Sequence, residues 1–433
     1  MLSQRLWRLL QLSRKIWVRT SLIAALAVIA AFASWAFHGL IPEEWAERFG
    51  AEAVLPVLNI LASSMLAVTT FSLSVMVTAH TSVASQVTPR AHRLLLEDTT
   101  TQSVLSTFLG AFIFALVALV LFRSGFYGGR DSVIVFAVTA LVIVLVVVAM
   151  LRWISHLSRL GSIDETMRQL ENRVRDNLTN HRRWPGLGAK TYENKETIPK
   201  GAVPVLTPLA GFVRHIDVGA VQKAAEARDC RVYLSAIPGD WAGEGDPVAY
   251  TDHAGEETAK KIVAAFTFSP LRSFDQDPRF GVFVLAEIAV RALSPGVNDP
   301  GTAIEVIGRL ERLLTETSSD QIVAEDPEYD NVRVRRLPEG ELIEEAFSMI
   351  ARDGAGMVEV ASRLLSTLRR MARSRDPELA DAARVLAQYA LAAAETALDR
   401  EHDLLRLHAS VEGWGGFDAE REPAPLVVRR GDE

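Results

Sequence analysis

The sequence predicts an integral membrane protein: a membrane α-helical part of four transmembrane helices, followed by a cytoplasmic α+β region with a small β module and a helical C-terminal part. Two observations predict this class. Long apolar segments without Asp, Glu, Lys or Arg are confined to about the first 155 residues, and the rest of the chain carries charges of both signs. Hydrophobic residues reach 49% of the chain because of that first third.

Four segments are long and apolar enough to cross a hydrocarbon core, which takes about 20 helical residues. Backbone polar groups in hydrocarbon must pair within their own segment, and these lengths suit helices rather than strands. A charge at the centre of such a helix costs roughly 2.5–3.5 kcal/mol, so the absence of charges is informative. The predicted spans are residues 21–40, 54–79, 103–122 and 132–151, within a transmembrane domain over 21–155.

Basic residues in the flanks predict the orientation. The first loop is mainly acidic, whereas the loops after the second and fourth spans carry arginines; Arg123 and Arg130 in the third loop are the exception. This balance places both termini in the cytoplasm. The basic segment 1–20 is amphipathic and either lies along the inner membrane surface or is a plain basic flank. Its basic residues are Arg5, Arg8, Arg14, Lys15 and Arg19.

A polar stripe runs along the second span and continues beyond it. At about 100° per residue its members fall within an arc of roughly 100°. In one interpretation, several copies of this helix line an ion path, since four helices alone are too few for a wide pore. In the other, the hydroxyls bond back to carbonyls one turn earlier and pack against small neighbours. The candidate pore-lining residues are Asn59, Ser63, Thr70, Ser74, Thr78, Thr81 and Ser85.

The region after the spans divides by composition. Residues 156–201 are predicted to form a helix and a Pro- and Gly-rich linker, and residues 202–252 a small β module. Residues 253–410 are mainly helical, with a strand over 329–337 and one long helix over 377–408, and the tail 411–433 is predicted to be disordered. The β module resembles the barrel-sandwich hybrid of biotinyl and lipoyl domains, without their carrier lysine. The resemblance lies in Pro208, Gly211, Val213, Ile216, Val218, Pro238, Gly239, Asp240 and Gly245.

The segment SPGVNDPGTA opens the predicted helix from Gly301. Asp299 suits a helix cap and Pro300 the first helical position. The alternative interpretation is that the helix start contacts a ligand or a neighbouring subunit, through Ser294, Asn298, Asp299 and Thr302.

The sequence lacks the features that are typical of several function classes. The net charge is −7 without a clustered basic face, so no nucleic-acid partner is expected. The lone Cys230 permits neither an internal disulfide nor a paired-cysteine zinc site. Phosphate loops, dinucleotide-binding glycines, metalloprotease helices and nucleophile elbows are all missing. We therefore expect no enzymatic activity, no cofactor and no metal.

Three motifs together resemble a bacterial family of uncharacterised predicted membrane proteins. They are TPRAHRLLLEDTTTQSVLSTFLG (88–110), FDQDPRFG (274–281) and ALSPGVNDPGTA (292–303). The resemblance implies the four-span layout and a bacterial inner membrane, and it implies no activity. Residues 88–102 form the cytoplasmic connection after the polar helix. Arg90, Arg93, Glu97 and Asp98 are therefore candidates for coupling the spans to the soluble region.

Two functions compete on this evidence. The first is a homo-oligomeric ion channel in the lipid bilayer, conducting small ions along the second span, with a cytoplasmic region that gates the path or forms its vestibule. The alternative is a membrane-anchored sensor or scaffold whose cytoplasmic region binds a small ligand or a protein partner. A membrane-bound enzyme is a third possibility with no residue set behind it.

Overall fold

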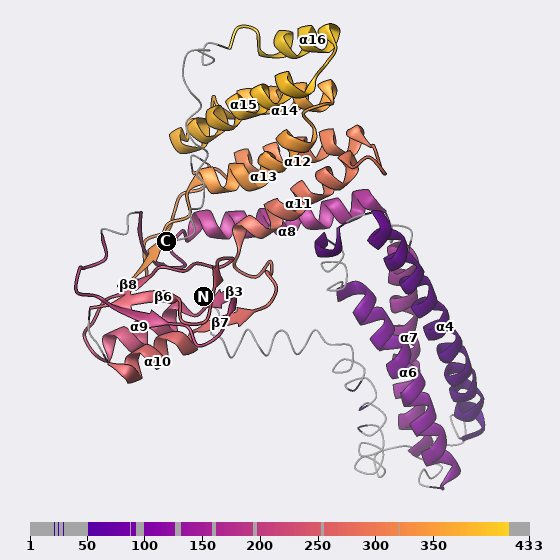
Figure 1. The fold of residues 1–433 in the computed structure, drawn as a ribbon. Coiled ribbons are helices and arrows are strands. Elements are labelled where there is room, and N and C mark those ends of the chain that lie inside the picture. Colours follow the sequence, from indigo (N-terminus) through magenta and orange to yellow (C-terminus); the bar gives the residue numbers. More distant parts are fainter. Residues whose placement is uncertain are drawn as a thin grey trace. The chain divides into compact units, whose positions relative to one another are not determined.

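The structure is a computed structural model of the 433-residue chain. It describes residues 21, 25, 29, 51–86, 88–91, 99–125, 131–157, 162–193, 197–252, 255–319 and 321–414. The described residues form two compact units (Figure 1). The helical unit lies within Arg5–Gln86 and His92–Glu165, and the α+β unit includes Val87–Ala91 and Thr166–Glu433.

The helical unit contains three helices that are long and apolar enough to cross a membrane, over Glu52–Ala79, Thr100–Arg123 and Ser132–Leu157. They coincide with the second, third and fourth predicted spans. The first predicted span and the segment 1–20 lie outside the described residues, apart from the helical Ser21, Ala25 and Ile29. The three helices are α4 (Ala51–Gln86), α6 (Thr99–Arg123) and α7 (Asp131–Leu157).

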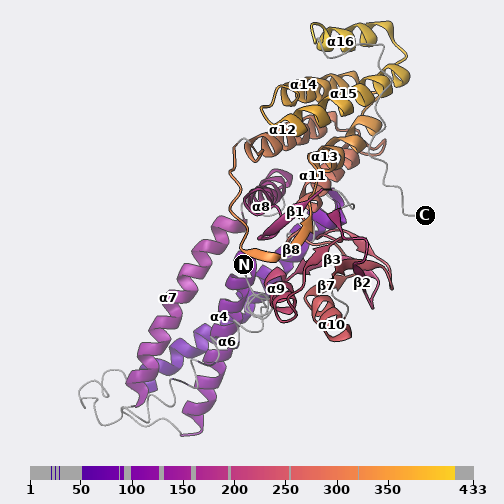
Figure 2. The same ribbon diagram turned by 90° about the vertical axis from the view of Figure 1, so that its left-hand side faces the viewer.

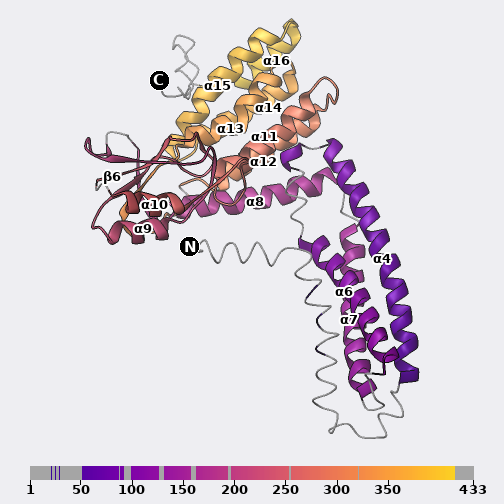
Figure 3. The same ribbon diagram turned by 60° about the horizontal axis from the view of Figure 1, so that its bottom comes forward.

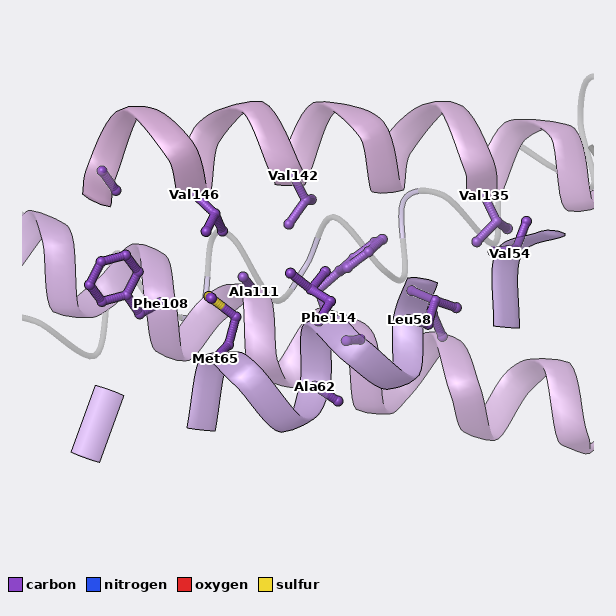
Figure 4. Packing of buried hydrophobic residues seen from close by; sticks show 14 of the residues in the cluster. Val54, Leu58, Ala62, Met65, Phe108, Ala111, Phe114, Val135, Val142 and Val146 are labelled. Atoms are coloured by element: carbon purple, nitrogen blue, oxygen red, sulfur yellow. The ribbon is translucent and has the colours of Figure 1, made fainter. Parts of the chain in front are cut away.

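Helix α6 packs against both α4 and α7. Its small residues Ala111, Ala115 and Ala118 are buried, which lets the neighbouring backbones approach closely. Figure 4 shows Met65 of α4 beside Ala111, with Val142 and Val146 of α7 facing the same cluster. The unit therefore has an apolar core to which each outer helix contributes one face.

The α+β unit opens with α8 (Ile163–Arg183) and holds two sheets. In the five-stranded sheet, of order β1-β8-β4-β6-β2, β8 runs parallel to β1 and β4, and the other pairs are antiparallel. The three-stranded sheet has the order β5-β3-β7. Helices α9 (Val218–Glu226) and α10 (Glu256–Ala264) lie side by side, as Figure 3 shows. The strands are β1 (Ala189–Tyr192), β2 (Val203–Leu206), β3 (Gly211–Ile216), β4 (Val232–Leu234), β5 (Trp241–Ala242), β6 (Pro247–Thr251), β7 (Phe266–Ser269) and β8 (Tyr329–Arg335).

The β region extends beyond the predicted module 202–252. Strand β1 lies inside the predicted linker and β7 in the region predicted to be mainly helical, whereas β8 confirms the strand predicted over 329–337. The structure does not confirm the barrel-sandwich hybrid, because a mixed sheet with parallel pairs takes its place. The physical reason is the buried β4–β8 pair, in which Val232 and Leu234 lie beside Val332 and Val334.

Six helices complete the α+β unit as a two-layer stack, visible in Figures 1 and 2. Helices α11, α13 and α15 pack on one another in sequence, and α12, α14 and α16 do the same. The predicted helix 377–408 is two helices, because the chain turns at Leu398 so that α16 folds back on α14. The bounds are α11 (Pro278–Leu293), α12 (Pro300–Glu316), α13 (Glu339–Asp353), α14 (Val358–Met371), α15 (Pro377–Ala397) and α16 (Glu401–Val411).

Three of these helices begin in the same way. Asp277, Asp299 and Asp376 each accept hydrogen bonds from backbone N–H groups of the first turn, and each precedes a proline at the start of the helix. An Asp cap satisfies donors that have no partner within the helix, and proline has no N–H to satisfy. The Asp-Pro pairs therefore fix where α11, α12 and α15 start.

Candidate functional site

The polar stripe lies on the side of α4 that faces away from the core. The buried side of the helix carries Leu58, Met65 and Ser72. All stripe residues with a described side chain are exposed, namely Asn59, Ser63, Thr70, Ser74, Thr78 and Thr81. Ser85 belongs to α4, but its side chain lies outside the described part. The described part of the chain therefore does not cover this polar face.

Local hydrogen bonds satisfy donors along the stripe. The Ser63 hydroxyl donates to the Asn59 carbonyl at 3.0 Å, and the Thr70 hydroxyl donates to the Leu66 carbonyl at 2.9 Å. Thr78, Thr81 and Asn59 bond one turn back in the same way. This matches the local-bonding part of the second interpretation. It also means that the hydroxyl oxygens of Ser63, Thr70, Thr78 and Thr81 present lone pairs, rather than protons, to whatever covers this face.

The motif FDQDPRFG joins four parts of the α+β unit. The Asn177 amide of α8 donates to the Phe274 carbonyl at 2.7 Å, and Arg214 of β3 donates to Asp275 at 2.9 Å. Asp277 caps α11 and accepts from Arg272 at 2.8 Å. Every acidic side chain of the motif is therefore held by an arginine of the same unit.

Arg279 of this motif is fully buried and lies at the centre of a charged cluster. It donates to Asp240 at 2.8 Å, to Glu341 of α13 at 2.6 Å and to the Pro238 carbonyl at 3.1 Å. Arg335 of β8 donates to the other oxygen of Asp240 at 2.7 Å. We call Asp240, Arg279, Arg335 and Glu341 the charged cluster. It connects both sheets to the helix stack.

The turn that carries Asp240 presses against the helix cap. Gly239 has φ +93°, and a Cβ built there would lie 2.3 Å from an Asp277 carboxylate oxygen. Only glycine fits this position, because it tolerates a positive φ and leaves room for the carboxylate. The glycine of the Pro-Gly-Asp sequence therefore brings Asp240 to Arg279.

The charged cluster predicts a loss of stability in acid. Burial alone would raise the pKa of Asp240, but the charges of Arg279 and Arg335 hold it below its usual range. The stabilisation from a depressed carboxyl pKa is present above the unfolded pKa and is lost as the pH falls through the folded pKa. We expect the protection of amides around Asp240, measured as the exchange rate relative to the intrinsic rate at each pH, to fall below about pH 4. The variant Asp240→Asn, which lacks this titration, is expected to show a flatter pH profile; identical profiles would contradict the assignment.

The residues that follow α4 belong to the α+β unit. The Thr88 hydroxyl accepts from the Ala91 N–H at 3.2 Å, and Arg90 forms an ion pair with Glu287 of α11. The Arg90 guanidinium also lies 5.5 Å from the centre of the Phe283 ring. Arg272 lies 5.8 Å from the same ring. Among the coupling candidates, Arg90 is thus anchored to α11, whereas Arg93, Glu97 and Asp98 lie outside the described residues.

The segment 294–302 forms an exposed turn between α11 and α12. Asp299 accepts from the Thr302 N–H at 3.1 Å and from its hydroxyl at 2.6 Å, and the Ser294 hydroxyl donates to the Arg291 carbonyl. The hydrogen bonds from Thr302 lower the pKa of Asp299. Asn298 has φ +51°, a left-handed conformation that asparagine tolerates better than most residues. The hydrogen bonds of Ser294, Asp299 and Thr302 thus stabilise the turn and the start of α12.

Sequence reasoning missed the charged cluster. The available signal was Arg279 itself, which stands in the apolar run that starts α11, where a charge implies a buried partner. Among the described residues, no group of three His, Cys, Asp or Glu side chains is placed to hold a metal ion.

These features define a class: a membrane protein whose hydrophobic helices are joined to a larger α+β unit that bears a charged cluster. The chain belongs to the family described as "Predicted membrane protein (DUF2254)", which it matches over residues 13–370.

Two curated relatives are uncharacterised mycobacterial proteins. The chain is 25% identical over 295 residues to Mb1321c of Mycobacterium bovis and to Rv1290c of Mycobacterium tuberculosis. Each alignment covers 66% of this chain and 55% of the relative, so the chain spans about half the length of the curated relatives it matches. No solved structure matches.

Proposed function

We propose that the protein is a homo-oligomeric ion channel of the bacterial inner membrane, with several copies of α4 around a polar path. The α+β unit lies on the cytoplasmic side in this proposal, where it gates the path or forms its vestibule. The observation that carries the proposal is the exposed polar face of α4, opposite the face that packs on α6.

The amount of polar surface favours a shared path over a lipid contact. Apolar side chains such as Leu66 and Phe71 are exposed on either side of the stripe and suit lipid. The arc between them holds six exposed polar side chains beside the apolar Ile60 and Val77, and the polar ones suit water or another polar surface instead. A ring of α4 helices would direct the stripes inward and the apolar flanks toward neighbours and lipid.

The proposed gate acts through Arg90. The chain leaves α4 at Gln86, and Arg90 then binds Glu287 on α11. The same helix begins at Asp277 and carries Arg279 of the charged cluster. Arg90 follows the last residue of α4 by only four positions. A movement of α11 would therefore be transmitted to the end of α4 through this short segment.

Reversing this ion pair tests the gate. We expect Arg90→Glu and Glu287→Arg each to place like charges together and to shift the open–closed equilibrium by about fivefold, equivalent to ~1 kcal/mol for a half-exposed pair. The double variant restores the pair and is expected to restore the single-channel open probability. A double variant that behaves like the sum of the two single ones would show that the pair does not link α11 to α4.

A second candidate function is a membrane-anchored sensor or scaffold. The observation that favours it is that three large apolar side chains on and beside the β5-β3-β7 sheet are exposed, namely Leu209, Trp241 and Leu271. Trp241 packs edge-on against Phe212, with ring centres 4.9 Å apart. Exposed aromatic and apolar side chains of this kind are typical of partner-binding surfaces. Capture of a defined partner by the full chain, lost in Trp241→Ser, would support this function.

The two functions separate in one reconstitution. The purified full chain is inserted into liposomes, its oligomeric mass is determined, and ion flux is measured for several ions and pH values. The channel proposal predicts flux from an oligomer. A monomer, or a folded oligomer that passes no ion, would overturn it and leave the scaffold as the function to pursue.

A further inference from the structure

Glu52 lies on the same face of α4 as the polar stripe. It stands in the first turn of the helix, seven residues before Asn59. Seven residues are about two turns, so at 100° per residue Glu52 falls within roughly 20° of Asn59. Its side chain is exposed, as are the stripe residues that follow.

Glu52 is also the only Asp, Glu, Lys or Arg in the helix sequence from Ala51 to Gln86. The exposed face thus begins with a carboxylate and continues with uncharged polar side chains, with the apolar Ile60 and Val77 exposed among them. By the predicted orientation, this end of α4 is the outer one.

The uncharged part of the stripe offers acceptors. Ser63, Thr70 and Thr78 each direct their only hydroxyl proton to a backbone carbonyl of α4. Their oxygens then present lone pairs on the exposed side. Lone pairs replace the hydration shell of a cation, whereas an anion needs N–H or O–H donors. To serve an anion, each hydroxyl would have to break its helix hydrogen bond.

We propose that the path is selective for small cations, with Glu52 from each copy forming a carboxylate ring at its outer mouth. The proposal rests on the ion-channel function and adds the charge of the ion and the residue that selects it. A ring of carboxylates concentrates cations at a pore mouth and repels anions. The hydroxyl oxygens of Ser63, Thr70 and Thr78 then support the partly dehydrated cation along the helix.

The test is a reversal potential measured on the full chain in planar bilayers under a KCl gradient. The expected potential has the sign for K⁺ permeation. Glu52→Gln is expected to lower the permeability of K⁺ relative to Cl⁻ by about fivefold or more at low salt, with a smaller effect at high salt where charges are screened. Glu52→Asp keeps the charge and is the matched control, expected to retain the selectivity.

The outcomes separate the two proposals. A potential with the sign for Cl⁻, no selectivity, or equal selectivity in wild type and Glu52→Gln would overturn the cation proposal and leave the pore standing. A folded oligomer without current for any ion would overturn the pore, and the cation proposal with it.

Discussion

Replacing Arg279 by methionine is expected to lower the free energy of unfolding of the α+β unit by about 3–5 kcal/mol, the usual cost of breaking a buried ion pair. Arg279 is fully buried and donates to Asp240 and Glu341. Methionine fills similar space but leaves the two carboxylates facing each other with only Arg335 between them. The negative charge that then lacks a partner contributes more to the loss of unfolding free energy than the lost hydrogen bonds do.

Hydrogen exchange of the full chain in detergent measures this loss locally, in peptides that cover α11 and α13. Arg352→Met is the matched control, because Arg352 pairs with Asp353 on the surface and such pairs contribute roughly 0–1 kcal/mol. Arg279→Lys is expected to fall between the two, since an ammonium cannot reach both carboxylates as a planar guanidinium does. Equal protection in Arg279→Met and Arg352→Met would show that the charged cluster is not needed for stability.

Leucine at position 70 or 74 is expected to lower ion flux by at least about tenfold, which corresponds to a barrier higher by ~1.4 kcal/mol. Each substitution removes an acceptor oxygen from the exposed face of α4 and adds apolar bulk there. In a homo-oligomer the change is repeated in every copy, so a polar constriction becomes a ring that excludes water.

Two variants control for unrelated damage to α4. Phe71→Leu changes an exposed apolar side chain beside the stripe and is expected to leave flux unchanged. Thr69→Val removes a neighbouring hydroxyl that bonds to the Met65 carbonyl on the packed side, and Thr70→Val is its isosteric counterpart on the stripe. If flux from well-folded oligomers is equal in Thr70→Leu and Phe71→Leu, α4 does not line the path.

The parts of the fold that were predictable from sequence are those fixed by local chemistry. Uncharged apolar runs of this length predicted α4, α6 and α7, because a helix pairs all its backbone groups within one segment and a membrane strand would be about half as long. Asp299 and Pro300 predicted the start of α12 because capping involves only a few adjacent residues. The period of α4 also predicted that the polar side chains of the stripe share one face, since this depends only on helix geometry.

The parts that were not predictable depend on residues far apart in the chain. Strand β1 pairs in parallel with β8, which follows more than a hundred residues later, and the short run 189–192 has no strand signal of its own. The turn at Leu398 lacks glycine and proline, so the sequence reads as one continuous helix. In both places tertiary packing decides the outcome over local preference.

The charged cluster shows the same limit for the site. Asp240, Arg335 and Glu341 lie on a turn, a strand and a helix that sequence alone could not bring to Arg279. The sequence alone places Glu52 among the acidic residues of the first loop. Its alignment with the stripe follows only once α4 is known to start at Ala51.

Water access to the stripe tests the central claim most directly. Cys230 is buried and the only cysteine, so a Cys230→Ala background allows single cysteines to be placed on α4. Ser74→Cys lies on the stripe, Ser72→Cys on the buried side, and Phe71→Cys on an exposed apolar position. A charged, water-soluble thiol reagent is expected to modify Ser74→Cys in reconstituted oligomers and to block ion flux, and to leave the other two unmodified. An unreactive Ser74→Cys, or one modified without any change in flux, would contradict the assignment of α4 as the lining of an ion path.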